Sequence, residues 1–312
     1  MSTTASISML AEYGILAASA HNTQGWIVSM DKETLMIHPD RARQLEADTT
    51  GRELFLGLGC FWGNVRAAAD AMGMRITDAI SGEAVRVVVE GIGGATDEGK
   101  LSAIRARRNN RFPLAGPFDA TISGVDLTGL QLHVITDLEA RAAIAAITRQ
   151  AFKQHLMNRA FCAEFADWVR SNTSTARDGI PGYALGFPTV ISYIIPFLIR
   201  TFPMAGPISR REGALMKSAP ATIVICGSAN QTGWISAGRA FSEVAVRLQE
   251  VGYTCAINNS AVEVPSCADE LAQLLGTDLC PLLVFRAGRP TKPCRPTPRR
   301  PLAEILRSSP AD

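Results

Sequence analysis

The sequence predicts a fold of mixed helices and strands with a duplicated helical core. Two long helices are expected, from about Gly51 to Met72 and from about Ile235 to Val251, and in each the apolar residues recur at spacings of four and three. An offset of 179 residues places Gly59 of the first helix on Gly238 of the second. Short strand-like runs and a further helix follow both. This pattern predicts two related units that pack helix against helix, and two unrelated core helices are the alternative interpretation.

The other elements are assigned from apolar periodicity and from glycine and proline breaks. Before residue 105 we expect a helix at 7–18, strands at 26–30, 34–38 and 86–90, and a helix at 97–107. After it we expect a strand at 130–135, a helical stretch at 138–169, a strand at 222–226, a helix at 266–275 and a strand at 281–285. We therefore divide the chain into a first unit, 1–104, and a second unit, 105–312.

An apolar segment at 178–211 interrupts the second unit. Its five prolines exclude one long regular helix, and its apolar run is too short and too broken for a membrane span. We expect a lid over a flat ligand, with an extension of the core and peripheral membrane contact as the alternatives. A proline-rich run at 286–312 is expected to form an extended arm that wraps around the protein.

Composition places the chain among ordinary globular proteins. Hydrophobic residues make up 47% and charged residues 19% of its 312 residues, and the net charge is +2. These values exclude general disorder and give no overall attraction to nucleic acid or membranes. Seven cysteines without a CxxC pair predict reduced thiols and no metal site. Because no signal peptide is recognised, a cytoplasmic location is expected.

The charge is unevenly distributed. From Arg286 to the end, seven Arg or Lys residues face two acids. A solubilising basic tail is the simplest interpretation. Binding of nucleic acid by this tail is a weaker alternative, because no aromatic residues alternate with the charges.

A loop dense in polar side chains follows the first helix. It consists of Ser19, Ala20, His21, Asn22, Thr23, Gln24, Gly25 and Trp26. Its hydroxyl, amide and imidazole groups can hydrogen-bond a planar heterocycle or a ribityl chain. An elaborate helix stop is the alternative.

Two arginine clusters are suited to an anion. Four arginines lie between Arg105 and Arg111 with no acid among them, and Arg299 and Arg300 form a second cluster. In an extended segment Arg107, Asn109 and Arg111 would share one face, which would offer two guanidinium groups and an amide to a phosphate and a carbonyl-rich ring edge. A solvated basic helix end is the alternative.

Other candidate motifs do not fit their chemistry. Gly91-Ile92-Gly93-Gly94-Ala95-Thr96 lacks the third glycine of a dinucleotide-binding loop, and no acid follows at the required distance. His38, His133 and His155 are interpreted as packing or surface residues. No Ser/His/Asp or Cys/His set is suggested, so no catalytic side chain is assigned.

Taken together, five segments of this chain resemble the flavin-dependent nitroreductase superfamily. The resemblance is closest to the single-chain branch typified by the mycobacterial dormancy-associated Acg-type proteins. The segments are 19–26, Asp40-Arg41-Ala42-Arg43-Gln44-Leu45, Gly51-Arg52-Glu53-Leu54, Arg107-Arg108-Asn109-Asn110-Arg111 and Thr297-Pro298-Arg299-Arg300-Pro301-Leu302.

The resemblance implies an α+β protein in which two fused units mimic the family homodimer, so that the chain could be monomeric. It implies FMN as the cofactor, which carries the hydride chemistry. The cofactor-binding residues implied are of three kinds. They are Ala18, Ser19, Ala20, Asn22 and Gln24 of the loop, Arg107, Asn109 and Arg111 of the arginine strip (residues 107–111), and Arg299 and Arg300 for the phosphate.

Two departures from the family pattern stand out. Gly25 replaces the proline that usually precedes the tryptophan, and Thr297 replaces a lysine before the last arginine. Because only one complete set of motifs is present, one FMN per chain is expected. The implied function is NAD(P)H-dependent reduction of nitroaromatics, quinones or a similar flat acceptor. The alternative is storage or sequestration of FMN beneath a lid that blocks NAD(P)H.

Overall fold

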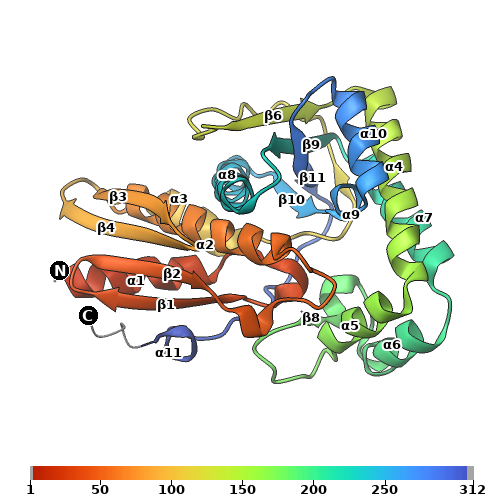
Figure 1. Ribbon diagram of the computed structural model, residues 1–312, viewed down its shortest axis with the longest axis horizontal. Coiled ribbons are helices and arrows are strands. Elements are labelled where there is room, and N and C mark those ends of the chain that lie inside the picture. The colour runs from red at the N-terminus through yellow and green to blue at the C-terminus, as the bar shows by residue number, and fades with distance from the viewer. Residues whose placement is uncertain (1–2, 308–312) are drawn as a thin grey trace.

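The computed structural model describes residues 3–307 and confirms the α+β class. The first two residues of the predicted first unit and the last five of the predicted arm lie outside this range. Two antiparallel sheets enclose a pair of long helices, so that the order of layers is sheet, α2, α8, sheet (Figure 1). The two helices are α2 (Arg52–Ala71) and α8 (Gln231–Glu250), close to the boundaries expected from their spacing.

The first sheet has the strand order β1-β2-β4-β3. Its strands are β1 (Trp26–Asp31), β2 (Thr34–Pro39), β3 (Met74–Ser81) and β4 (Ala84–Ile92). Two further helices, α1 (Thr3–Ile15) and α3 (Glu98–Ala106), pack against α2. The predicted strands of this half are confirmed, and β3 is an additional strand that the sequence analysis did not assign.

The second sheet has the order β10-β11-β9-β6, with β5 also paired to β11. Its strands are β5 (Leu114–Ala115), β6 (Leu130–Ile135), β9 (Ala221–Gly227), β10 (Thr254–Ile257) and β11 (Cys280–Pro290). Every residue of β9 is buried, because one face packs towards α8 and the other towards an outer helical layer. That layer contains α4 (Leu138–Met157), α7 (Ala205–Ser218), α9 (Ser260–Glu263) and α10 (Pro265–Leu275).

The predicted helical stretch at 138–169 is wrong in one respect, since it is broken at Asn158. The helix α4 ends there and α5 (Arg159–Trp168) begins. The side-chain oxygen of Asn158 accepts hydrogen bonds from the backbone N–H groups of Ala160 and Phe161, which caps α5. The first helix also ends earlier than expected, at Ile15.

The two central helices approach so closely that glycine is required at their contact. A Cβ atom on Gly59 would lie 2.0 Å from the carbonyl oxygen of Ile235, and one on Gly238 would lie 2.1 Å from that of Leu56. The two contacts are reciprocal, because the same offset of 179 residues relates both pairs. Reciprocal contacts of this kind occur where two copies of a subunit meet across a two-fold axis.

The apolar segment does not form one long helix, as its prolines predicted, but contains one helix and the start of another. A short parallel pair, β7 (Val169–Arg170) and β8 (Ile180–Pro181), and a 3-10 turn at Gly182–Leu185 lead into α6 (Thr189–Thr201). The helices α6 and α7 meet at 115°. Within the described range no single helix meets the length and hydropathy expected of a membrane span, although this bent pair meets them jointly.

One face of α6 packs and the other does not. Ile195 and Ile199 pack with Ala166 of α5, whereas Val190 is 76% and Phe197 is 61% exposed. The arm after β11 has no helix until α11 (Leu302–Ile305), which lies beside β1 in Figure 1.

Candidate functional site

The loop at 19–26 has a strained backbone. His21, Asn22 and Gln24 have φ values of 50°, 57° and 53°, and these are three of the four non-glycine residues with positive φ in residues 3–307. Such conformations cost of order 1–3 kcal/mol each and persist where the surrounding contacts enforce them. The hydroxyl of Ser19 accepts a hydrogen bond from the backbone N–H of Gln24 and closes the loop.

The side chain of Asn22 binds two segments that are distant in the sequence. Its amide donates to the carbonyl oxygens of Gly179 at 3.0 Å and Pro298 at 3.1 Å, and its own oxygen accepts from Arg299 at 2.9 Å. Both amide hydrogens and the oxygen of Asn22 are therefore used within the chain. The side chain holds the loop against the predicted lid and the arm.

Gln24 makes a second connection, from the loop to the residue just before the segment 178–211 and to the arm. Its amide donates to the carbonyl oxygen of Arg177 at 2.8 Å, and its side-chain oxygen accepts from the backbone N–H of Arg300, also at 2.8 Å. The residue is 0% exposed, so both hydrogen bonds are shielded from water. Asn22 and Gln24 therefore connect the loop to residues 177–179 and to the arm.

A carboxylate at the start of the segment 178–211 binds an arginine that precedes α2. Asp178 lies between Arg43, which pairs with it closely, and Arg170, whose Nη2 lies 2.9 Å away. Burial alone would raise the pKa of Asp178, but hydrogen bonds from Arg170 and Arg43 and their charges lower it below its usual range. Arg43 also donates to the carbonyl oxygen of Thr23 and so ties this carboxylate to the loop.

Replacing Asp178 by asparagine is expected to loosen the segment 171–181 from the loop. Both arginines would lose their charged partner in a partly buried site, and asparagine cannot accept from both with equal strength. Backbone amide exchange of this segment should accelerate by roughly tenfold or more, while exchange in α2 stays unchanged. Asp167→Asn is the matched control, because Asp167 pairs with Arg200 at an exposed position. Equal acceleration in both variants would contradict the assignment.

Two arginines, Arg107 and Arg299, meet where the first helix ends, and Arg108 lies close enough for its charge to act on Arg299. Arg107 is 3% exposed and donates to the carbonyl oxygen of Leu16, and Arg299 donates to the carbonyl oxygens of Leu16 and Ala17. Burial, with the nearby charges of Arg107 and Arg108, lowers the pKa of Arg299 to about 9. None of the three has a carboxylate within ion-pair distance in the part of the chain that the structure describes.

Several nitrogen atoms of this arginine cluster (Arg107, Arg108 and Arg299) are buried without a hydrogen-bond partner. They are Nε and Nη1 of Arg107, Nε of Arg108 and Nε of Arg299. A buried guanidinium without a counter-charge is unfavourable, and an anion bound here would relieve it. Thr297 accepts hydrogen bonds from Arg299 through both its hydroxyl and its carbonyl oxygen, and so orients this arginine.

Arg300 has a different environment, although it is adjacent in sequence. Its guanidinium lies 3.7 Å from Glu304 and 3.8 Å from Asp40, and it donates to the backbone oxygens of Gln24 and Glu304. Its charge is thus balanced within the chain. Of the two predicted C-terminal arginines, the structure brings only Arg299 into the cluster.

Arg111 lies at the other end of the strip. Within residues 3–307 its side chain has no hydrogen bond, and burial, partly offset by Glu212, lowers its pKa. Burial and the charge of Arg111 together lower the pKa of His21 to about 4, so this imidazole is neutral at physiological pH. Asn109 accepts from the backbone N–H of Ile257 at 2.7 Å and thereby fixes the strip to β10.

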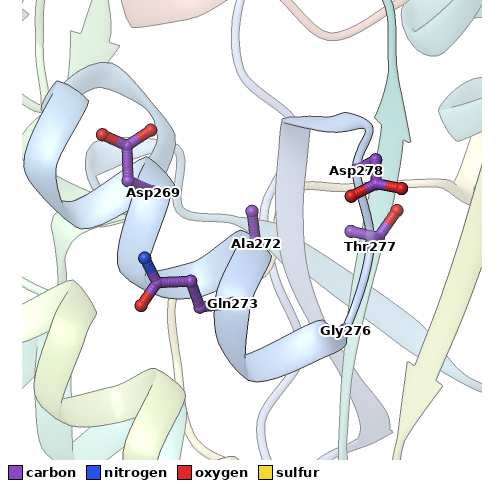
Figure 2. A pocket seen from close by; sticks show the side chains of 6 residues that line it. All are labelled: Asp269, Ala272, Gln273, Gly276, Thr277 and Asp278. Atoms are coloured by element: carbon purple, nitrogen blue, oxygen red, sulfur yellow. The ribbon is translucent and has the colours of Figure 1, made fainter.

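The remaining loop residues line its base. Ala18 is buried, and Ala20 borders a small hollow together with Thr23, Arg43, Asp48 and Glu53. A larger, shallow hollow lies elsewhere, at the end of α10 (Figure 2). Its lining has two acids and no base, and it contains none of the predicted site residues: Asp269, Ala272, Gln273, Gly276, Thr277 and Asp278.

Sequence reasoning missed the residues that connect the segments. Arg43 and Asp178 are ordinary surface types whose pairing spans 135 residues of sequence. Phe161 and Phe165 of α5 pack edge-on against His21, with ring centroids 6.4 and 5.1 Å away. No local pattern signals such partners, because they depend on how α5 folds back onto the loop.

Comparisons with known proteins find similarity only among solved structures. No protein-family model and no curated protein matches the sequence. The chain is similar to an FMN- and NADPH-dependent nitroreductase from sphigopyxis sp. strain HMH, with 16% identity, a TM-score of 0.43, and coverage of 67% of this chain and 98% of that one.

Two Vibrio proteins give comparable values. The NADPH:FMN oxidoreductase from Vibrio harveyi complexed with NAD+ has 15% identity, a TM-score of 0.41, and coverage of 69% of this chain and 78% of that one. Nitroreductase A from Vibrio parahaemolyticus RIMD 2210633 has 14% identity, a TM-score of 0.40, and coverage of 69% and 77%. Identity is low throughout, so a functional assignment depends on the residues of the site itself.

Proposed function

We propose that this protein binds one FMN per chain and uses it for NAD(P)H-dependent reduction of a flat acceptor such as a nitroaromatic or a quinone. The observation that carries the proposal is the arginine cluster. Three guanidinium groups, with buried unpaired nitrogens and no carboxylate partner among the described residues, form a site for a dianion.

The residues present fit the phosphate of FMN. Arg107 and Arg299 would donate to its oxygens, with Arg108 adding positive charge, while Asn22 and Thr297 keep Arg299 in place. Arg111 lies four residues after Arg107 and would contact the carbonyl end of the flavin ring. A fixed positive charge there would favour negative charge that develops on the ring.

When bound, FMN supplies the hydride chemistry. The protein residues then have three tasks, which are binding, orientation and control of access. Arg107 and Arg299 anchor one end of the ligand, and Ala18, Ser19 and Ala20 would border its middle. Asn22 and Gln24 act indirectly, because their hydrogen bonds fix the lid and the arm around the loop.

We further propose that the chain is a fused pseudo-dimer of the single-chain Acg type and functions as a monomer. The reciprocal contacts of Gly59 and Gly238 support a pseudo-two-fold axis between α2 and α8. The segment 178–211 would act as a lid, because its first residues bind the loop directly. A permanently closed lid would leave FMN bound and NAD(P)H excluded, which is the storage function.

An anaerobic titration of the FMN-reconstituted protein tests this function. NADPH should bleach the visible absorbance of the flavin, with dithionite as the positive control. Bleaching by dithionite alone would show that FMN is held but shielded, and would replace reduction by storage. Failure to retain any flavin spectrum after reconstitution would refute the cofactor assignment.

A further inference from the structure

One side of the helix α6 is apolar and exposed. Four large apolar side chains on this side are 46–76% exposed: Val190, Tyr193, Ile194 and Phe197. They recur at intervals of three and four residues, so they share one face of the helix. The opposite face is the one that packs against α5, and the exposed face therefore points away from the rest of the chain.

A fifth apolar side chain extends this face beyond the end of the helix. Phe202 is 52% exposed, and its ring meets that of Phe197 edge-on with the centroids 6.4 Å apart. We call these five side chains the α6 patch. The helix α6 lies at the edge of the molecule, at the lower right of Figure 1, away from α2, α8 and the sheets around them. A contiguous apolar patch that is left exposed marks a place where an apolar partner binds.

The surroundings of the α6 patch carry a surplus of positive charge. Residues 179–211 contain no acid and three arginines, Arg200, Arg210 and Arg211. In residues 159–218, which cover α5 to α7, seven Arg or Lys side chains stand against four acids. This part of the chain therefore has a formal charge of +3, whereas the whole chain has +2. The partner that fits such surroundings is anionic as well as apolar.

The three arginines remain accessible to an anionic partner. Arg200 pairs with Asp167 of α5, and Arg211 lies 3.1 Å from Glu212, yet the two arginine side chains are still 44% and 45% exposed. Arg210 is exposed and has no ion-pair partner in the part of the chain that the structure describes. Surface ion pairs of this kind are weak, so an anionic surface can compete for these guanidinium groups.

The dimensions of α6 suit a position on a lipid surface. Its 13 residues rise by roughly 20 Å, whereas the hydrocarbon core of a bilayer is roughly 30 Å thick. The next helix, α7, is held by the protein itself, because Met216 packs with Ile144 and Ala151 of α4. A helix with one apolar, aromatic face and arginines nearby is typical of those that lie in the interface of an anionic bilayer.

We propose that the α6 patch docks the protein on the surface of a bilayer that contains anionic lipids. The apolar side chains would enter the boundary between headgroups and acyl chains, and the three arginines would interact with the lipid phosphates. A second copy of the chain fits less well, since a symmetric contact through the patch would bring like charges together. The docking does not depend on the proposed function, because the patch shares no residue with the arginine cluster.

Flotation of the whole chain with lipid vesicles tests the docking. The protein should float with vesicles made of equal parts of phosphatidylcholine and phosphatidylglycerol, and far less with vesicles of phosphatidylcholine alone. Phe197→Ser should weaken binding to the mixed vesicles by roughly tenfold or more, because the transfer of a phenylalanine side chain out of water contributes at least that much. The exposed position of Phe197 means that this variant should fold as the wild type does.

Leu138→Ser is the matched control for the apolar contact. Leu138 is 62% exposed, but it begins α4, whose 20 residues extend for roughly 30 Å before α5 starts. This variant should bind the mixed vesicles as tightly as the wild type. Equal weakening by Leu138→Ser and Phe197→Ser, or failure of the wild type to float with either kind of vesicle, would overturn the proposal.

The contribution of charge is tested at Arg210. Arg210→Gln should weaken binding to the mixed vesicles roughly fivefold, which is the effect expected of one arginine near an anionic surface. Arg86→Gln is the control, because Arg86 is exposed on β4 of the first sheet and far from α6 in Figure 1. An equal effect of the two variants would mean that only the overall charge matters, and would contradict docking through α6.

Analytical ultracentrifugation without lipid tests the competing occupant. The sedimentation coefficient of the wild type should not change with protein concentration. Self-association of the wild type that Phe197→Ser abolishes, together with a failure to float, would assign the α6 patch to a contact between copies of the chain and replace the lipid surface.

Discussion

Alanine at Gly59 or Gly238 is expected to destabilise the protein by about 3 kcal/mol or more. Each new Cβ would lie about 2 Å from a carbonyl oxygen of the opposite helix, at 2.0 Å from Ile235 and 2.1 Å from Leu56. These oxygens belong to helical backbone and cannot move without separating α2 from α8. Because the two contacts are reciprocal, both variants should lose similar amounts of free energy of unfolding.

Urea denaturation followed by circular dichroism measures this effect. Gly93→Ala is the control, because a Cβ at Gly93 would have no neighbour within 4 Å and its φ is ordinary. The control should stay within about 0.5 kcal/mol of the wild type. A midpoint for Gly59→Ala equal to that of the control would show that the helix contact is looser than described.

Arg299→Gln is expected to weaken FMN binding by roughly 10- to 100-fold and to leave riboflavin binding unchanged. Riboflavin lacks the phosphate, so its affinity reflects every proposed contact with the flavin except those made by the arginine cluster. Loss of one charge-assisted hydrogen bond costs about 1.5–3 kcal/mol, which corresponds to this range of affinity. Arg107→Gln should act in the same direction, because both side chains reach the same helix end.

Fluorescence titration of FMN and of riboflavin against each variant gives the ratio of the two dissociation constants. Arg300→Gln is the matched control, since the charge of Arg300 is balanced by Glu304 and Asp40. It should leave the preference for FMN over riboflavin intact. If Arg299→Gln weakened the binding of FMN and of riboflavin equally, Arg299 would have a structural role in the arm and would not belong to the proposed phosphate site.

The helical core could be predicted from the sequence because its geometry repeats locally. Spacings of four and three residues identify the buried faces of α2 and α8, and the glycines that follow these helices, Gly73 and Gly252, have φ values of 62° and 78°. The equivalence of Gly59 and Gly238 could be read from the offset of 179 residues. How closely the two helices approach could not be predicted from the sequence.

The site was predictable only in part, because its side chains choose partners that are distant in sequence. Asn22 and Gln24 are residue types common in ligand-binding sites, yet residues 177–179 and the arm occupy their hydrogen-bonding groups. Arg299 and Arg300 differ because Glu304 lies one helical turn after Arg300. His155, interpreted as a packing residue, faces a carboxylate that the sequence places 108 positions away.

The junction of loop and arm has a consequence for biosynthesis. Contacts of Arg299 and Arg300 with the end of the first helix and the loop span 276 to 283 residues, so the proposed anion site does not exist in a nascent chain that lacks these two arginines. The central helices can pair on the ribosome before that point, whereas the last long-range contacts close only after residue 300 has emerged. A chain truncated before Arg299 would thus be able to pair its central helices without forming the proposed anion site.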